Sequence, residues 1–200
     1  MLNAMLTGVG GQGTVLAAKI LAQAAQTKGW QVRTAETIGM AQRGGSVVSH
    51  VRMGNGGEEV LAPLIAKTTA DLIIAFEPAE AARVLPYLAP DGVVVTATTP
   101  IQPITVALSG APYRSEDIIR SLTNIFGEEA LARLHAVDDA SVLEELGNRK
   151  ALNTVLLASA LATGHLPLSI DDLRDAVSVC VKPRFIELNM RAIDLAASGA

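Results

Sequence analysis

The segment that most constrains the fold is the start of the chain, where a short apolar run leads into four closely spaced glycines and then an alanine- and leucine-rich run. Residues 2–6 are too few for a helix and predict a buried strand. Between residues 14 and 28, polar side chains recur three and four positions apart, which predicts an amphipathic helix. The sequence therefore predicts a strand, a glycine loop and a helix.

A loop of this kind presents unshielded backbone N–H groups at the positive end of a helix, where a phosphate or carboxylate can bind. Gly8, Gly10 and Gly13 have the spacing of the dinucleotide-binding fingerprint, with a strand before and a helix after. A P-loop is disfavoured, because Thr14 and Val15 follow where that motif needs a lysine. The same glycines would also serve a tight turn that binds no ligand, and both interpretations stay open.

Composition narrows the class of protein. The chain has 200 residues, half of them hydrophobic, which is enough for one domain with a substantial core. Its net charge of −4 and its lack of Lys or Arg runs give no electrostatic footprint for nucleic acid. We find no secretory signal and no apolar stretch of membrane length, so we expect a cytoplasmic protein without a membrane partner.

Cysteine and histidine content argues against a metal or redox centre in the chain. Cys180 is the single cysteine, which excludes an internal disulfide and a self-contained iron–sulfur cluster, since such clusters take four thiolates. The three histidines lie far apart and have no ligand-spaced cysteine beside them. If electrons move in this system, we expect another chain to carry them.

The rest of the chain alternates between strand and helix patterns, which predicts an α/β fold with a Rossmann-like parallel or mixed sheet flanked by helices and a helical C-terminal part. Predicted strands are residues 31–35, 46–53, 72–76, 92–97, 104–108 and 135–138. Predicted helices begin at residues 78 and 115 and span 148–162, 169–181 and 183–197. No linker or repeat divides the chain, so we expect one domain over residues 1–200.

Two further stretches hold candidate functional residues. In Gln42-Arg43-Gly44, a glycine-flanked guanidinium could clamp a phosphate or carboxylate, or contact another subunit. Glu36 lies roughly where a Rossmann protein places the acid that binds a ribose, but it is equally well explained as a solvated strand end. On the strand predicted at 46–53, alternate residues make one face polar and a candidate for function.

Four blocks, in this order along the chain, resemble the gamma domain of 2-oxoacid:ferredoxin oxidoreductases, and most nearly the beta subunits of indolepyruvate ferredoxin oxidoreductases. The blocks are residues 8–14 (GVGGQGT), 39–52 (GMAQRGGSVVSHVR), 144–151 (EELGNRKA) and 182–189 (KPRFIELN). The resemblance covers nearly the full length, and it is far more specific than one glycine loop.

The resemblance implies a subunit that assembles with larger chains carrying thiamine diphosphate, Mg²⁺ and iron–sulfur clusters. Such a complex converts a 2-oxoacid, here an indolepyruvate or another arylpyruvate, and coenzyme A to acyl-CoA and CO₂ while reducing ferredoxin. This chain has no Gly-Asp-Gly element of a thiamine diphosphate site, so we expect it to be inactive alone and to hold no catalytic or metal residue. The residues expected to contact a cofactor or a coenzyme A phosphate are Gly8, Gly10, Gly11, Gln12, Gly13, Thr14, Gln42, Arg43 and Gly44.

Two other functions remain open at this point. One is a free-standing dehydrogenase that binds NAD or FAD at the glycine loop, although no convincing acid or base for hydride transfer stands out. The other is a purely structural assembly subunit. Pairing of two copies of the chain is also compatible with the broad apolar faces of the C-terminal helices.

Overall fold

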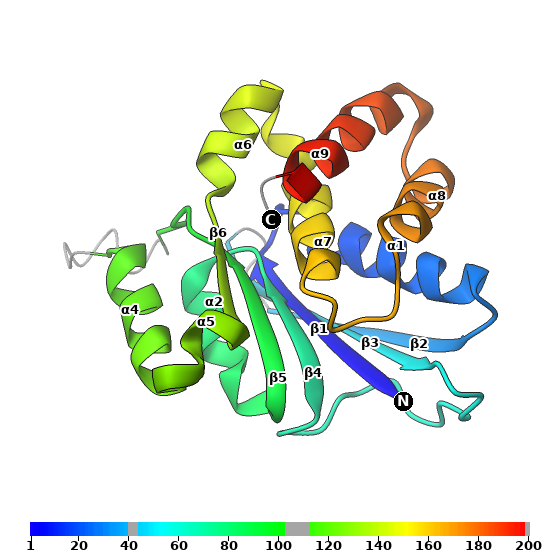
Figure 1. Ribbon diagram of the computed structural model, residues 1–200, viewed down its shortest axis with the longest axis horizontal. Helices are drawn as coiled ribbons and strands as arrows, with labels where there is room; N and C mark the ends of the chain where they lie inside the picture. The colour runs from blue at the N-terminus through cyan, green and yellow to red at the C-terminus, as the bar shows by residue number, and fades with distance from the viewer. Residues whose placement is uncertain (40–43, 103–112, 199–200) are drawn as a thin grey trace.

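The computed structural model describes residues 1–39, 44–102 and 113–198. These residues form a six-stranded sheet in the order β2-β3-β1-β4-β5-β6, with helices on both faces (Figure 1). The strands are β1 Leu2–Val9, β2 Gln31–Ile38, β3 Ser46–Gly54, β4 Ala70–Ala75, β5 Leu88–Ala97 and β6 Leu134–Val137. The predicted α/β class is confirmed, and the sheet is mixed.

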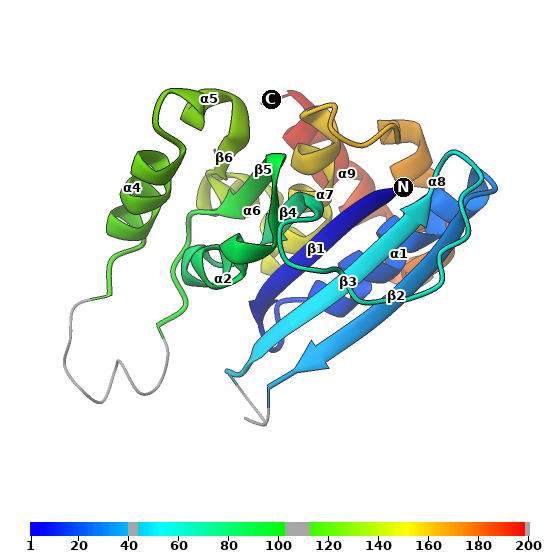
Figure 2. The ribbon, with the colours of Figure 1, turned by 90° about the horizontal axis from the view of Figure 1, so that it is seen from below.

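The sheet has a parallel part and an antiparallel part. Strands β1, β4, β5 and β6 are parallel neighbours. On the other side of β1, strand β3 runs antiparallel to it and pairs antiparallel with β2 at the sheet edge, as Figure 2 shows from below. Strands β1 and β2 extend beyond their predicted ends, because β3 supplies pairing partners for Gly8 and Val9 and for residues 36–38. Strand β5 also starts four residues before the predicted residue 92. The strand predicted at 104–108 lies outside the described residues.

Two layers of helices cover the sheet (Figure 1). On one face lie α1 Thr14–Thr27, α6 Asp139–Leu146, α7 Leu152–Ala162, α8 Ile170–Cys180 and α9 Ile186–Ser198. The opposite face carries α2 Pro78–Val84, α4 Ser115–Phe126 and the short α5 Ala130–Arg133. Four 3₁₀ turns complete the set: η1 Leu85–Tyr87, η2 Gly127–Glu129, η3 Arg149–Ala151 and η4 Pro183–Phe185. Thus η3 and η4 form the first turns of the helices predicted at 148–162 and 183–197.

The larger core lies under α1 and α7. Because side chains alternate along a strand, Leu6 faces this core while its neighbour Met5 faces the core under α2. Helix α1 contributes mostly alanines, whose small side chains let it pack close to the sheet and to α8. Helix α7 is buried on nearly all sides between the sheet, α1 and α9. The polar residues at its first turn are therefore held inside the molecule.

The polar face of β3 packs against residues 60–66. The backbone N–H of Ile65 donates to Nδ1 of His50 over 3.2 Å, and Nη1 of Arg52 donates to the carbonyl of Ala62 over 2.8 Å. These hydrogen bonds hold residues 60–66 against the strand, which gives the polar side chains of this face a structural role. Burial lowers the pKa of His50, an effect that outweighs the opposing field of Glu36. None of the described helices has both the length and the apolar character needed to cross a membrane.

The lowered pKa of His50 predicts a pH-dependent stability. Because the folded state holds the imidazole neutral, the unfolded chain binds more protons once the pH falls below the ordinary histidine value of about 6.5. We expect the free energy of unfolding to decline as the pH falls from about 7 to about 5, and to decline less in His50→Asn, whose Oδ1 can accept the Ile65 N–H without titrating in this range. Urea unfolding at several pH values measures this, and equal slopes in the two proteins would contradict it.

Candidate functional site

The loop between β1 and α1 is held by its own hydrogen bonds. The N–H of Gly10 donates to the carbonyl of Gly45 over 2.9 Å, which ties the loop to the start of β3. The Gln12 side chain accepts from the Val9 N–H and donates to the Phe76 carbonyl, both over 2.7 Å. Since Val9 ends β1 and Phe76 follows β4, this one amide joins the ends of two parallel strands.

Glycine is needed at three loop positions for different reasons. A Cβ on Gly8 would lie 2.8 Å from the Cβ of Phe76, a distance that real side chains do not reach. Gly11 and Gly13 have φ angles of +102° and +88°, in the region that favours glycine. Helix α1 starts directly after Gly13 with no side-chain cap, so the N–H groups of its first turn lie at the positive end of the helix dipole.

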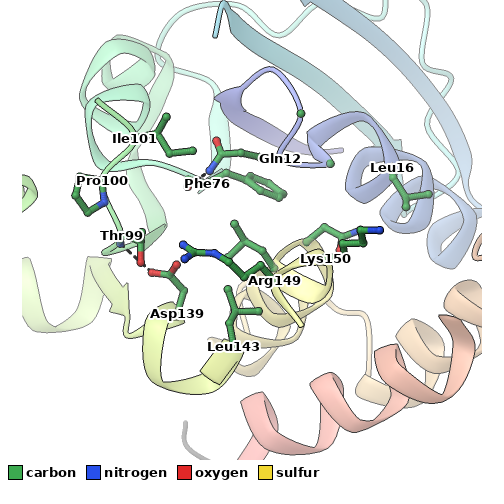
Figure 3. A pocket seen from close by; sticks show the side chains of 14 residues that line it. Gln12, Leu16, Phe76, Thr99, Pro100, Ile101, Asp139, Leu143, Arg149 and Lys150 are labelled. Atoms are coloured by element: carbon green, nitrogen blue, oxygen red, sulfur yellow. Dashed lines mark hydrogen bonds between the residues drawn. The ribbon is translucent and has the colours of Figure 1, made fainter. Parts of the chain in front are cut away.

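A pocket of about 370 Å³ opens in front of this loop (Figure 3). It lies beyond the carboxyl ends of β1, β4 and β5, the edge at which α/β sheets bind ligands. The glycine loop and the first turn of α1 form one wall, residues 99–101 after β5 form a second, and α6, η3 and α7 form the rest. The pocket thus combines backbone N–H donors with side chains from the C-terminal part of the chain.

Two cations enter the pocket from η3. In Figure 3, Arg149 extends toward Thr99 and Asp139, whereas Lys150 extends toward the side on which α1 lies. Both residues are exposed, and within the described ranges neither forms an ion pair with a carboxylate. The Lys150 ammonium lies 5.8 Å from the centroid of the Phe185 ring, which holds it by a cation–π contact. Both charges are therefore available to an anionic ligand.

The acidic residue of the pocket is engaged by backbone donors. Asp139 is 1% exposed, and its Oδ1 accepts hydrogen bonds from the N–H groups of Thr98 and Thr99, each over 2.9 Å. Figure 3 draws the bond to Thr99. This carboxylate fixes the chain as it leaves β5, and it lies across the pocket from the glycine loop. We therefore place the anion-binding end at the loop.

The structure brings only part of the predicted site together. Gly11, Gln12 and Gly13 line the pocket, while Gly8 and Gly10 shape the loop behind it. The Thr14 hydroxyl is buried and has no hydrogen-bond partner among the described residues. Gly44, with a φ of +76°, forms the turn before Gly45. Gln42 and Arg43 lie outside the described residues.

Sequence reasoning missed Arg149, Lys150 and Asn153 as site residues. The available signal was the third block of the resemblance, which ends with two cations directly before the apolar helix α7. The fourth block supports the third, because Asn189 donates to the Phe185 carbonyl over 2.7 Å and accepts a hydrogen bond from the Thr154 hydroxyl. This holds the aromatic ring against Lys150, so separate blocks of sequence meet at one edge of the sheet.

The sheet order differs from that of a dinucleotide-binding Rossmann fold. There, the strand after the first helix is the parallel neighbour of β1 and presents the ribose-binding acid. Here, the antiparallel β3 lies between β1 and β2, and Glu36 on β2 pairs with Ser49 of β3. Glu36 is thus a full strand further from the glycine loop, which weakens the case for NAD or FAD.

Comparison with known proteins identifies the family. The model of the pyruvate ferredoxin/flavodoxin oxidoreductase family matches residues 3–199. The chain belongs to this family. It is 36% identical to indolepyruvate oxidoreductase subunit IorB of Thermococcus kodakarensis over 99% of this chain and 95% of that protein. It is 27% identical to the common gamma subunit of the pyruvate/ketoisovalerate oxidoreductases of Pyrococcus furiosus over 96% of this chain and 93% of that protein.

Solved structures of similar fold agree with this assignment. The gamma subunit of a keto/oxoacid ferredoxin oxidoreductase from Geobacter sulfurreducens superposes with a TM-score of 0.68 at 22% identity and full coverage of both chains. A 2-oxoglutarate:ferredoxin oxidoreductase from Magnetococcus marinus, solved with 2-oxoglutarate, coenzyme A and succinyl-CoA bound, gives 0.70 at 18% identity over all of this chain and 31% of that one. At these identities the likeness concerns the fold alone.

Two glycines of the loop should respond differently to an added methyl group. We expect Gly8→Ala to lower the free energy of unfolding by about 1–3 kcal/mol, since its Cβ would overlap the rigid Cβ of Phe76. Gly10→Ala is the matched control, because its Cβ would meet nothing closer than the Gly45 carbonyl at 3.6 Å. Denaturant unfolding compares the two variants. A Gly8→Ala protein as stable as Gly10→Ala would disprove the close approach of β1 and Phe76.

Proposed function

We propose that this chain is the gamma-type subunit of a cytoplasmic, thiamine-diphosphate-dependent 2-oxoacid:ferredoxin oxidoreductase, and that its pocket holds the phosphate groups of coenzyme A. The observation that carries this proposal is that the glycine loop before the uncapped start of α1 lines the same pocket as Arg149 and Lys150. Backbone donors at a helix N-terminus and charge-assisted side-chain donors are the two usual means of binding phosphate. Gly11, Gln12, Gly13 and Thr14 would form the loop side of that site.

Other chains must supply the redox chemistry. The sequence has no Gly-Asp-Gly element of the kind that anchors thiamine diphosphate through a metal ion, which supports placing that cofactor on a partner chain. Its one cysteine likewise cannot ligate a cluster. When bound on a partner, thiamine diphosphate provides the electron sink for decarboxylation, and iron–sulfur clusters there would pass electrons to ferredoxin. We propose indolepyruvate or another arylpyruvate as substrate, supported by the IorB relatives.

The rim of the pocket supports docking of a partner subunit. Leu16 and Ile101 line the pocket, and each keeps more than a third of its side chain exposed, as does the adjacent Val15. Apolar side chains around a charged pocket favour burial against another protein surface. We propose that a larger subunit packs over this rim and thereby places the bound coenzyme A beside the reaction centre. For Arg43 we keep the expectation from the sequence that it contacts a phosphate or the partner subunit.

Removing either pocket cation should weaken the binding of coenzyme A but not that of the 2-oxoacid. In the assembled complex we expect Arg149→Ala or Lys150→Ala to raise KM for coenzyme A roughly 10- to 100-fold, because a charge-assisted hydrogen bond contributes about 1.5–3 kcal/mol. KM for the 2-oxoacid should stay unchanged. Arg120→Ala is the control, since Arg120 pairs with Asp117 on α4, on the opposite face of the sheet. Steady-state kinetics measures the effect, and an unchanged KM for coenzyme A in both pocket variants would refute the site.

Activity should require the partner chains. We expect the purified chain alone to turn over no 2-oxoacid, and the co-expressed complex to reduce ferredoxin with indolepyruvate in preference to pyruvate. Spectroscopic assay of ferredoxin reduction, with each 2-oxoacid in turn, measures both expectations. Turnover by the isolated chain, or a flavin or nicotinamide that stays bound to it through purification, would instead favour a free-standing dehydrogenase.

A further inference from the structure

Asn153, the second residue of α7, is a buried amide that lines the pocket. It is 3% exposed, and its Oδ1 has no hydrogen-bond partner among the described residues. It lies close to Gly13: if that glycine carried a Cβ, this atom would lie 3.6 Å from the Asn153 Cβ and 3.8 Å from its Nδ2. The amide therefore packs directly against the start of α1, where we place the anion.

A second buried asparagine shows what a structural role looks like. Asn189 is 5% exposed, and both ends of its amide are bonded, one to the Thr154 hydroxyl and the other to the Phe185 carbonyl. Leaving a buried polar group unpaired is costly, and nearly all such groups in folded proteins have a partner. A buried acceptor without a partner is therefore expected where a ligand supplies the missing hydrogen bond.

We propose that Asn153 is a specificity-determining residue, whose amide binds a neutral donor–acceptor edge of the ligand that holds its phosphate at α1. An asparagine amide offers one acceptor and two donors in a plane. Its natural complement is a group with an N–H beside an acceptor, as on the edge of an adenine ring or in a secondary amide. Coenzyme A carries both groups, and this inference rests on the function proposed above.

The residue would supply selectivity that charge cannot. Glycine N–H groups, Arg149 and Lys150 recognise a phosphate whatever is attached to it. A site built to hydrogen-bond one particular group rejects ligands that lack it, because its own buried polar atom then stays unpaired. In this arrangement the loop and the cations provide attraction, and Asn153 distinguishes coenzyme A from inorganic diphosphate.

Calorimetric titration of the full chain tests this with four probes: coenzyme A, adenosine 3′,5′-bisphosphate, 4′-phosphopantetheine and inorganic pyrophosphate. Asn153→Leu keeps the branching of the side chain at Cγ and removes its hydrogen-bonding groups, and the smaller Asn153→Ala removes them without adding volume. We expect the leucine variant to bind coenzyme A roughly 10- to 100-fold more weakly, and pyrophosphate within about twofold of the unchanged chain. The fragment whose affinity falls with that of coenzyme A identifies the recognised group, adenine or amide.

Thermal unfolding without ligand distinguishes a binding role of Asn153 from a structural role, because the two predict opposite shifts of the unfolding midpoint. Because Asn153→Leu removes an unpaired buried oxygen, we expect its unfolding midpoint to rise, while Asn189→Leu should lower the midpoint by breaking two hydrogen bonds. A midpoint lowered by both Asn153→Leu and the smaller Asn153→Ala would overturn the inference, because overpacking can lower it only in the leucine variant. So would unchanged binding of coenzyme A and both fragments to the leucine variant.

The two proposals fail in distinguishable ways. If the unchanged chain binds coenzyme A no more tightly than pyrophosphate, Asn153 adds no recognition, and the inference falls while the anion pocket stands. If the chain binds neither probe, the phosphate site itself is wrong, and the inference falls with it. Arg149→Ala separates the contributions, since it should weaken pyrophosphate and coenzyme A alike.

Discussion

The pocket depends on how the ends of β1 and β4 are joined. Gly8 lets the backbone of β1 approach Phe76 to a distance at which any side chain would overlap, and the Gln12 amide then bridges Val9 and Phe76 across the gap. Because both hydrogen bonds end on backbone groups, the glycine loop is fixed relative to the sheet rather than to a neighbouring side chain. Because α1 starts directly after this loop, the same hydrogen bonds also fix the direction of the N–H groups in its first turn.

The antiparallel insertion of β3 gives the loop a second support. A parallel neighbour on this side of β1 would end, rather than start, beside the loop. Here, β3 starts where β1 ends, so the Gly45 carbonyl can accept the Gly10 N–H. The same reversal moves β2 and Glu36 away from the loop. The strand arrangement that supports the glycine loop thus also moves Glu36 away from the place where a dinucleotide site has its ribose-binding acid.

Local sequence patterns predicted most of the elements but not their arrangement. Apolar runs and glycine breaks located β1, β4 and α1, since these depend on nearby residues. The ends of β1 and β2 were set too early, because Gly8, Val9 and residues 36–38 have no strand signal and are ordered by pairing with β3. Gly13 was predicted as a site residue from its fingerprint spacing with Gly8 and Gly10, and Gly11 as part of the glycine loop and of the first block of the resemblance. Arg149 and Lys150 were not, because a separation of about 140 residues carries no pattern that places them at the same loop.

The C-terminal helices give the candidate pocket a rigid support. Helix α7 is buried on nearly all sides, so its first turn and the preceding η3 project from a rigid element, with Lys150 held against Phe185 and Phe185 held by Asn189. A site on such a support can keep an unpaired polar atom, because surrounding packing prevents the helix from rotating to satisfy it. Asn153 and the Thr14 hydroxyl are two atoms of this kind, one on each of the helices that meet at Gly13. A third atom of this kind, the Ser49 hydroxyl, lies on β3, so it is the position of Asn153 beside the pocket and Gly13, together with its lack of a partner, that supports the proposed binding role.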